Sequence, residues 1–236
     1  MTLWNDFSKL LSHGIFIKFT EKEEYAEDLK KCIYMNTPHF YRKHEKNGIG
    51  DKREINDDYL IWCVTYINGC DIAFRWNNKY GTCIQFDGKI KKDIKKMING
   101  DKKHNIDSMG KYMVIIFNPM EYIGNFISKF YSVNLVLDGE SSYEIAPVQF
   151  GSVDYGKKAK YNKRLFKKNK VYKYQHEFRL VIDIYKDNHE DPGGFKTDFV
   201  DLEYNDIVIL KCSDIIEDDG KILIPINIKS VIKERK

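Results

Sequence analysis

One stretch, residues 157–183, changes its pattern halfway along and constrains the fold more than any other part of the chain. Its first part, residues 157–173, contains nine basic residues among seventeen and no acidic residue. A packed core would accept such a run only together with matching buried carboxylates, so we expect this basic segment to be solvated. From Phe178 to Ile184 apolar residues then occupy every second position, which is typical of a strand with one buried face. The sequence therefore predicts a cationic segment that leads directly into a rigid strand.

Length and composition indicate a soluble, globular chain. With 236 residues, of which 42% are hydrophobic and 31% are charged, the chain can bury a core without disulfides. The five cysteines show no paired CxxC spacing, which favours reduced thiols in the cytoplasm over a zinc site. No apolar run approaches the roughly 18 residues of a membrane-spanning helix, and the start lacks the pattern of a secretory signal. We therefore expect a cytoplasmic protein with no membrane partner and no metal.

The order of the predicted elements favours an α+β fold, with a mixed or antiparallel, strand-rich core and flanking helices, in a single domain over residues 1–236. The strands are predicted over residues 15–19, 33–35, 60–67, 71–76, 81–86, 112–117, 133–137, 143–150, 178–184, 207–210 and 222–226. Helices are predicted over residues 21–31, 89–98 and 119–130. Thr20 and Glu23 have the spacing of a capping box at the start of the first helix.

Gln175 and Glu177 form a Gln-x-Glu pair where the basic segment meets the strand. Two positions apart in a strand, their side chains are predicted to share one face and to contact one ligand. A buried Glu177 could accept a hydrogen bond from a ribose hydroxyl and stabilise an oxocarbenium-like centre. The alternative is a solvated Glu177 that pairs with Arg179 or with nearby lysines and contributes little.

Lys18 lies in an otherwise apolar strand, on the same side as Phe16 by alternation. Such a cation could bind a phosphate or pyrophosphate, or it could simply face water. His39 and His44 have no third ligand at metal spacing, so they do not indicate a metal site. The Walker, GxGxxG, HExxH and GxSxG patterns do not occur, which argues against phosphoryl transfer and serine hydrolysis.

Aromatic residues are interleaved with the lysines of the basic segment. Cations bind phosphates, and aromatic rings stack on unpaired bases, so the segment predicts contact with nucleic acid, preferably RNA. An acidic protein partner or a plain solvated loop would also fit this composition. The candidate substrate-binding residues are Lys163, Arg164, Lys167, Lys168 and Tyr174.

Three stretches of the sequence form a combination of motifs. The first covers residues 36–54 and closes on Gly50-Asp51-x-x-Glu54. The second reads Arg75-Trp76-x-x-x-Tyr80-Gly81-Thr82-Cys83-Ile84-x-Phe86-Asp87, and the third reads Lys170-x-x-x-Tyr174-Gln175-x-Glu177-Phe178-Arg179-Leu180. In their order and spacing they resemble a widespread bacterial family of uncharacterised cytoplasmic proteins that are often found near defence genes. Arg75 stands where a small or apolar residue is expected before the tryptophan.

The chain also resembles ADP-ribosyltransferases, in which a basic residue on a first strand, a polar motif and a Gln-x-Glu build the active site. The resemblance implies NAD as a substrate, with Glu177 at the nicotinamide ribose, Gln175 at the acceptor and the basic segment at the target. It puts Lys18 at the position where the family has Arg or His, so this chain departs from the family pattern there. It implies that the remaining NAD contacts come from the polar motif and its neighbour, which are Asn36, Thr37 and Tyr41.

We therefore expect an NAD-dependent ADP-ribosyltransferase toxin that modifies nucleic acid, with RNA preferred over DNA, in antiphage defence. By analogy with such systems, an antitoxin protein is expected as a partner. The alternatives are a non-catalytic nucleic-acid or protein interaction module that uses the same basic segment, and an NAD glycohydrolase that consumes NAD without labelling an acceptor.

Overall fold

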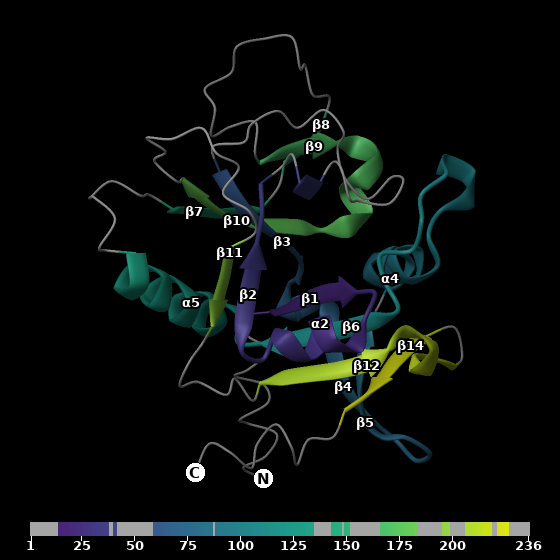
Figure 1. Ribbon diagram of the computed structural model, residues 1–236. Coiled ribbons are helices and arrows are strands. Elements are labelled where there is room, and N and C mark those ends of the chain that lie inside the picture. The colour runs from purple at the N-terminus through teal and green to yellow at the C-terminus, as the bar shows by residue number, and fades with distance from the viewer. Residues whose placement is uncertain are drawn as a thin grey trace, which may run out of the picture.

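The computed structural model describes ten ranges of the chain and confirms an α+β architecture, with antiparallel, strand-rich sheets and few helices (Figure 1). The described residues are 14–37, 40–41, 59–86, 88–134, 143–147, 149–151, 166–183, 195–198, 206–218 and 221–226. No helix among them is both long enough and apolar enough to cross a bilayer.

A six-stranded sheet forms the centre of the molecule, and every neighbouring pair in it is antiparallel. Its strands, in spatial order, are β12 (Ile207–Lys211), β6 (Tyr112–Phe117), β1 (Ile15–Thr20), β3 (Tyr59–Ile67), β10 (Glu177–Asp183) and β7 (Tyr143–Pro147). β3 lies between β1 and β10, so segments that are far apart in the sequence meet on its two edges. Alternation along these strands gives the sheet two covered faces.

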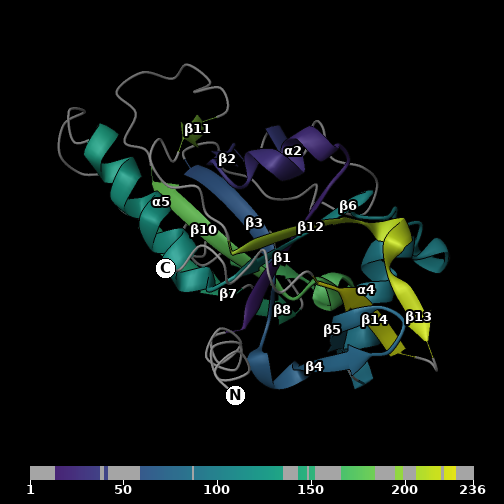
Figure 2. The same cartoon turned by 90° about the horizontal axis from the view of Figure 1, so that it is seen from below.

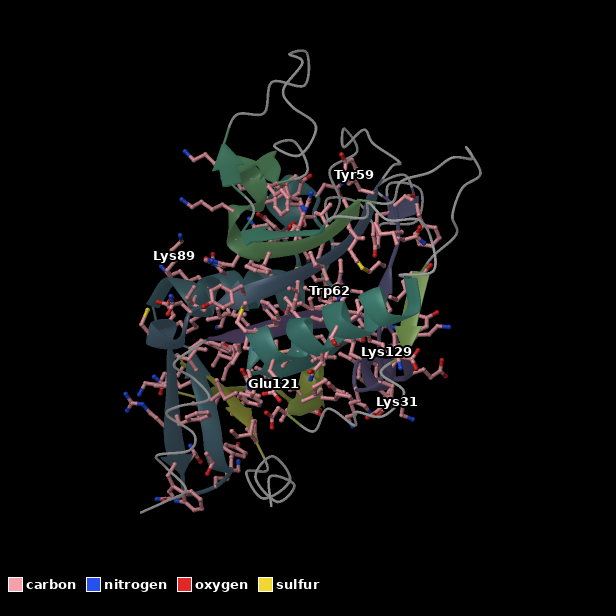
Figure 3. The ribbon with its side chains drawn as sticks, turned by 90° about the vertical axis from the view of Figure 1, so that its left-hand side faces the viewer. Lys31, Tyr59, Trp62, Lys89, Glu121 and Lys129 are labelled. Carbon is pink, nitrogen blue, oxygen red and sulfur yellow. The ribbon has the colours of Figure 1, made fainter. Side chains whose placement is uncertain are left out.

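One face of this sheet is covered by α5 (Pro119–Asn134), α2 (Glu23–Asp28) and the antiparallel pair of β2 (Cys32–Met35) and β11 (Phe195–Asp198). Trp62 of β3 is 1% exposed and packs between Phe16 and Tyr122 of α5, with ring centroids 5.9 Å from each. Figure 3 shows Trp62 beside α5. Burial of these aromatic side chains, together with the aliphatic residues around them, stabilises this layer.

The opposite face is covered by α4 (Gly88–Asn99) and by a second antiparallel sheet (Figure 2). The strands of this sheet, in spatial order, are β13 (Ile216–Asp218), β14 (Lys221–Pro225), β5 (Gly81–Phe86) and β4 (Ile72–Asn77). Ile94 of α4 and Phe86 of β5 pack with Ile17 and Ile115 of the central sheet in one buried cluster. α4 buries Ile90, Ile94 and Met97, the helical spacing that its sequence predicts.

The end of β10 that starts at Glu177 is capped by a small assembly of short elements. β8 (Gln149–Gly151) pairs in parallel with β9 (Lys167–Asn169), and a 3₁₀ helix, η3 (Lys170–Gln175), connects β9 to β10. The other short 3₁₀ helices are η1 (Gly69–Asp71), η2 (Lys102–His104) and η4 (Cys212–Asp214). The β8–β9 pair and η3 together fix the entry of the chain into β10.

Two local predictions are wrong. Thr20 does not cap α2, because it is the last residue of β1 and pairs with Tyr112, and its hydroxyl donates to the carbonyl of Lys22 instead. The strand predicted over residues 133–137 is wrong at Val133 and Asn134, which end α5, and residues 135–137 lie outside the described residues. Packing of the helical face of α5 against the sheet outweighs the strand propensity of one β-branched residue.

Candidate active site

The strands that carry Lys18 and Glu177 lie on the two edges of β3. Ile17 of β1 and Glu177 of β10 both pair with Thr65 of β3. Residues paired in this way share one face of the sheet, so Lys18, which follows Ile17, leaves the face opposite to Glu177. The register therefore does not bring the side chains of Lys18 and Glu177 together.

Glu177 is buried and held between two cations. Its Oε2 accepts a hydrogen bond from Nζ of Lys168 at 2.6 Å, and its Oε1 accepts one from Nε of Arg179 at 2.5 Å. Arg179 is two residues further along β10, so its side chain leaves the same face of the strand as Glu177. Both cations are themselves buried. The carboxylate is thus neither solvated nor paired at the surface.

The two cations keep Glu177 ionised. Burial by itself would raise the pKa of this carboxyl group, but the charges of Arg179 and Lys168 and their hydrogen bonds outweigh burial. The pKa of Glu177 is therefore held well below the ordinary value for a glutamate. A negative charge is fixed at this point of the sheet throughout the physiological pH range.

Gln175 converges on the same ammonium group as Glu177. Its Oε1 accepts from Nζ of Lys168 at 2.9 Å, and its Nε2 makes a long contact of 3.5 Å with the hydroxyl of Tyr174. The two side chains converge on Lys168 of the chain itself, and the predicted strand alternation is not the cause. Gln175 ends the 3₁₀ helix η3 and does not belong to the strand, so strand alternation does not align it with Glu177.

His176 supplies the backbone geometry that brings the two side chains together. Its φ of 46° is in the left-handed region, where His is tolerated better than most residues other than Gly. Its Nε2 lies 2.8 Å from Oδ2 of Asp93 on α4, and its carbonyl accepts from the amide of Tyr66 at 2.9 Å. Helix α4 and strand β3 therefore hold the turn that aligns Gln175 with Glu177. We refer to Lys168, Gln175, Glu177 and Arg179 as the polar centre.

Lys168 corrects the prediction that the basic segment is solvated. It is only 4% exposed, it pairs with Glu177, and its Nζ lies 5.1 Å from the ring centroid of Tyr172. Tyr174, predicted to contact the target, is also buried, and Nζ of Lys96 lies 4.2 Å from its ring centroid. A buried lysine needs a matching carboxylate, and Glu177 supplies it from outside the basic segment.

The rest of the basic segment is only partly described. Lys163 and Arg164 lie outside the described residues, and so does the side chain of Lys167, whose backbone belongs to β9. Lys170 and Lys173 of η3 are exposed beside the polar centre. These two lysines, and not Lys168, are the described cations of the segment that a large anionic partner can reach.

Lys18 is half-buried, and its Nζ donates to the backbone carbonyl of Cys63 at 2.6 Å. β1 and β3 pair as far as Ile17 and Thr65, and the ammonium group of Lys18 bonds to β3 just beyond that pair. Open water, one of the two predicted surroundings, does not describe this arrangement. The contact joins the strand of Lys18 to the strand that pairs with β10.

The predicted polar motif lies against the end of β3. Asn36 and Thr37 are buried, and the backbone of Asn36 forms a bridge with Ile61, whose carbonyl also accepts from the hydroxyl of Tyr41 at 3.2 Å. The side chains of Asn36 and Thr37 accept from the amides of Thr37 and Phe40 at 2.8 and 3.3 Å. All three predicted residues thus contact β3 or hold the turn beside it.

Sequence reasoning missed Cys63 and Asp93. The thiol of Cys63 lies within the electrostatic reach of Glu177, Arg179 and Lys18, and burial, followed by the charge of Glu177, raises its pKa to about 12. Such a thiol is protonated at neutral pH and is a poor nucleophile. For Asp93 a signal existed, because it is the one acidic residue among the lysines of α4.

The polar centre presents a fixed negative charge on Glu177 and two hydrogen-bond acceptors, on Glu177 and Gln175, in a buried position. Within the described ranges, no group of three or more His, Cys, Asp or Glu side chains is arranged to hold a metal ion. The side chains that carry chemistry here are therefore a carboxylate, an amide and two cations. Comparison with family models, with curated proteins and with solved structures finds no match to this chain.

Proposed function

We propose that the chain is an NAD-dependent ADP-ribosyltransferase that modifies nucleic acid, RNA in preference to DNA, as the toxin of an antiphage system. One observation supports the proposal most directly. Oε1 of Gln175 and Oε2 of Glu177 both accept from a single ammonium group, at 2.9 and 2.6 Å. Two acceptors that converge on one point suit the paired hydroxyl donors of a ribose, whose place Lys168 takes in this arrangement.

Two further features support the same reaction. Glu177 is ionised and fixed by Arg179, as a carboxylate that stabilises a cationic ribose must be. Lys170 and Lys173 are exposed on the 3₁₀ helix that leads to the site, where the phosphates of a nucleic acid can reach them.

In the proposed reaction, the bond between the ribose C1′ and the nicotinamide nitrogen breaks, and its electron pair leaves with neutral nicotinamide. Ribose hydroxyls replace the ammonium group of Lys168 at Gln175 and Glu177, and Lys168 pairs with a phosphate oxygen of NAD. A nucleophilic atom of the acceptor then bonds to C1′. Its proton passes to solvent, because the lowered pKa makes Glu177 a poor base.

A second function, a non-catalytic interaction module, is favoured by a different reading of the same ion pairs. Lys168 and Arg179 offset the charge of Glu177, so the three residues could serve only to hold η3 and β9 on the sheet. In that case the exposed lysines of η3 bind a partner and no NAD is consumed. The two functions differ in whether Glu177 changes its partners during the working cycle.

The test is to incubate the protein with NAD labelled in its phosphates and with total RNA, DNA or lysate protein. We expect covalent label on RNA, and we expect Glu177→Gln to lower labelling by about 100-fold or more, because it removes the charge that stabilises the ribose cation. Glu177→Asp keeps the charge but withdraws the carboxylate by one methylene, and about 10-fold to 100-fold less label is expected. Gln175→Ala should lower labelling of RNA while NAD is still consumed.

Glu217→Gln is the matched control, because Glu217 also pairs with a lysine, Lys95, but on the distant strand β13. It should label RNA as the unchanged protein does. NAD consumption without any labelled acceptor would assign a glycohydrolase. No consumption of NAD, by a folded protein and with every acceptor, would reject the proposal in favour of the interaction module.

A further inference from the structure

The β4–β5 hairpin carries the second motif noted in the sequence, and the reaction proposed above does not use it. Figures 1 and 3 place this hairpin at the opposite end of the molecule from β9 and η3. β4 forms one edge of its sheet, and its partner β5 lies inside. The hairpin, residues 72–86, is therefore a separate candidate surface.

Trp76 is the most exposed large hydrophobic side chain in the described part of the protein, at 68%. It follows Ile72 and Phe74 on the face that packs against the core, but it lies beyond the core's edge. A tryptophan that is left in water at this position contributes little to folding. Exposed tryptophan is instead typical of surfaces that bind a partner.

The turn of the hairpin follows directly after Trp76. Oδ1 of Asn77 accepts from the amides of Lys79 and Tyr80, at 2.9 and 3.1 Å. Gly81 has a φ of 75°, and a Cβ added there would lie 4.0 Å from Cζ3 of the Trp76 ring. The Trp-x-x-x-Tyr-Gly spacing thus sets a tight turn with the indole ring beside Gly81.

The charges of the hairpin select the kind of partner. Residues 72–86 include two basic residues, Arg75 and Lys79, and no acidic residue. Both cations are exposed, and Nζ of Lys79 lies 4.9 Å from the ring centroid of Tyr80. Arg75 and Trp76 leave opposite faces of the edge strand β4, so one extended chain can stack on the ring and cross the edge to reach Arg75.

We propose that the β4–β5 hairpin is a binding site for single-stranded nucleic acid. Trp76 stacks on an unpaired base, and Arg75 and Lys79 bind the flanking phosphates. A duplex keeps its bases stacked on one another and offers only phosphates, so it binds less tightly. The site requires no NAD and no chemistry at Glu177, and it can be tested separately from the proposed reaction.

The test uses fluorescence of Trp76, in a Trp4→Phe background, during titration with single-stranded RNA of about 20 nucleotides at low salt and without NAD. The remaining tryptophan, Trp62, is buried, so a change in fluorescence on adding RNA reports on Trp76. We expect the RNA to quench this fluorescence, because a base stacks on the Trp76 ring. Trp76→Ala should weaken binding by about 5-fold to 150-fold, measured with end-labelled RNA. Trp76→Phe should keep most of the affinity without the quenching.

Tyr25→Ala is the matched control, since Tyr25 is 54% exposed and, like Tyr80 of the hairpin, has a lysine, Lys22, over its ring. It lies on α2 among acidic residues and should leave RNA binding unchanged. Affinity of Trp76→Ala within 2-fold of the unchanged protein, or no binding of single strands, would overturn the proposal. A second outcome would also overturn it, in favour of a protein partner. In that outcome RNA does not change the fluorescence, and a protein that the unchanged chain captures from a lysate is no longer captured by Trp76→Ala.

Discussion

The polar centre and the β4–β5 hairpin contain the same kinds of side chains in opposite surroundings. In the polar centre, Lys168 and Arg179 are buried beside a tyrosine and share the carboxylate of Glu177. In the hairpin, Arg75 and Trp76 are exposed, in a segment without an acidic residue. The difference shows that a carboxylate from elsewhere in the chain decides whether cations and aromatic rings enter the core or remain available to a partner.

The largest expected difference between the two regions is in stability. Glu177→Gln leaves two buried cations without their carboxylate and should lower the free energy of unfolding by about 3–5 kcal/mol. Arg75→Gln removes an exposed charge and should change it by less than about 0.5 kcal/mol. Urea unfolding of both variants measures these values. Similar losses in the two variants would mean that the regions do not differ as described.

The effect of pH should separate the regions further. The pKa of Glu177 is lowered in the folded protein, so its stabilisation is present above the ordinary glutamate value of 4.5 and is lost as the pH falls below it. The gap in unfolding free energy between the unchanged protein and Glu177→Gln should be constant near neutral pH. Below about pH 4.5 it should shrink by about 1 kcal/mol per pH unit.

Glu217→Gln provides the comparison for this pH series, because its partner Lys95 and its own carboxylate are both partly exposed. The difference in unfolding free energy between Glu217→Gln and the unchanged protein should stay near zero at every pH. A gap for Glu177→Gln that does not shrink at all between pH 4.5 and about pH 3 would show that the carboxylate is not ionised and paired in the folded protein.

The smallest expected effect concerns the salt dependence of the hairpin. If Arg75 and Lys79 each neutralise one phosphate, replacing either with Gln should reduce the slope of log affinity against log salt by about 0.7 for single strands. The same titrations on Lys170→Gln test whether η3 contributes independently. An unchanged slope in the two hairpin variants would remove the phosphate contacts from the proposal and leave only stacking.

Strongly apolar strands could be predicted from the sequence almost residue by residue. β6 agrees with its predicted bounds, and β3, β10 and the hairpin agree within one or two residues. β3 and β6 are nearly continuous apolar runs, because both faces of the central sheet are covered. α4 was equally clear, since its apolar residues have helical spacing among lysines.

The details of the polar centre could not be predicted, because they depend on contacts between distant segments. Burial of Lys168 requires the β9–η3 connection to fold back onto Glu177, and local charge density indicates the opposite. The left-handed backbone of His176 has no clear sequence signal, since glycine or asparagine is the usual residue there. The bond from Lys18 to the carbonyl of Cys63 follows only from the sheet register.

The position of β3 between an early and a late strand has a consequence for synthesis of the protein. β1 can pair with β3 as soon as both have left the ribosome, but the other edge of β3 waits for β10, near the end of the chain. Until then, an apolar strand with unsatisfied amides and carbonyls is open to neighbouring nascent chains. Fragments that end before Glu177 should therefore aggregate and require chaperones, whereas the whole chain closes this edge itself.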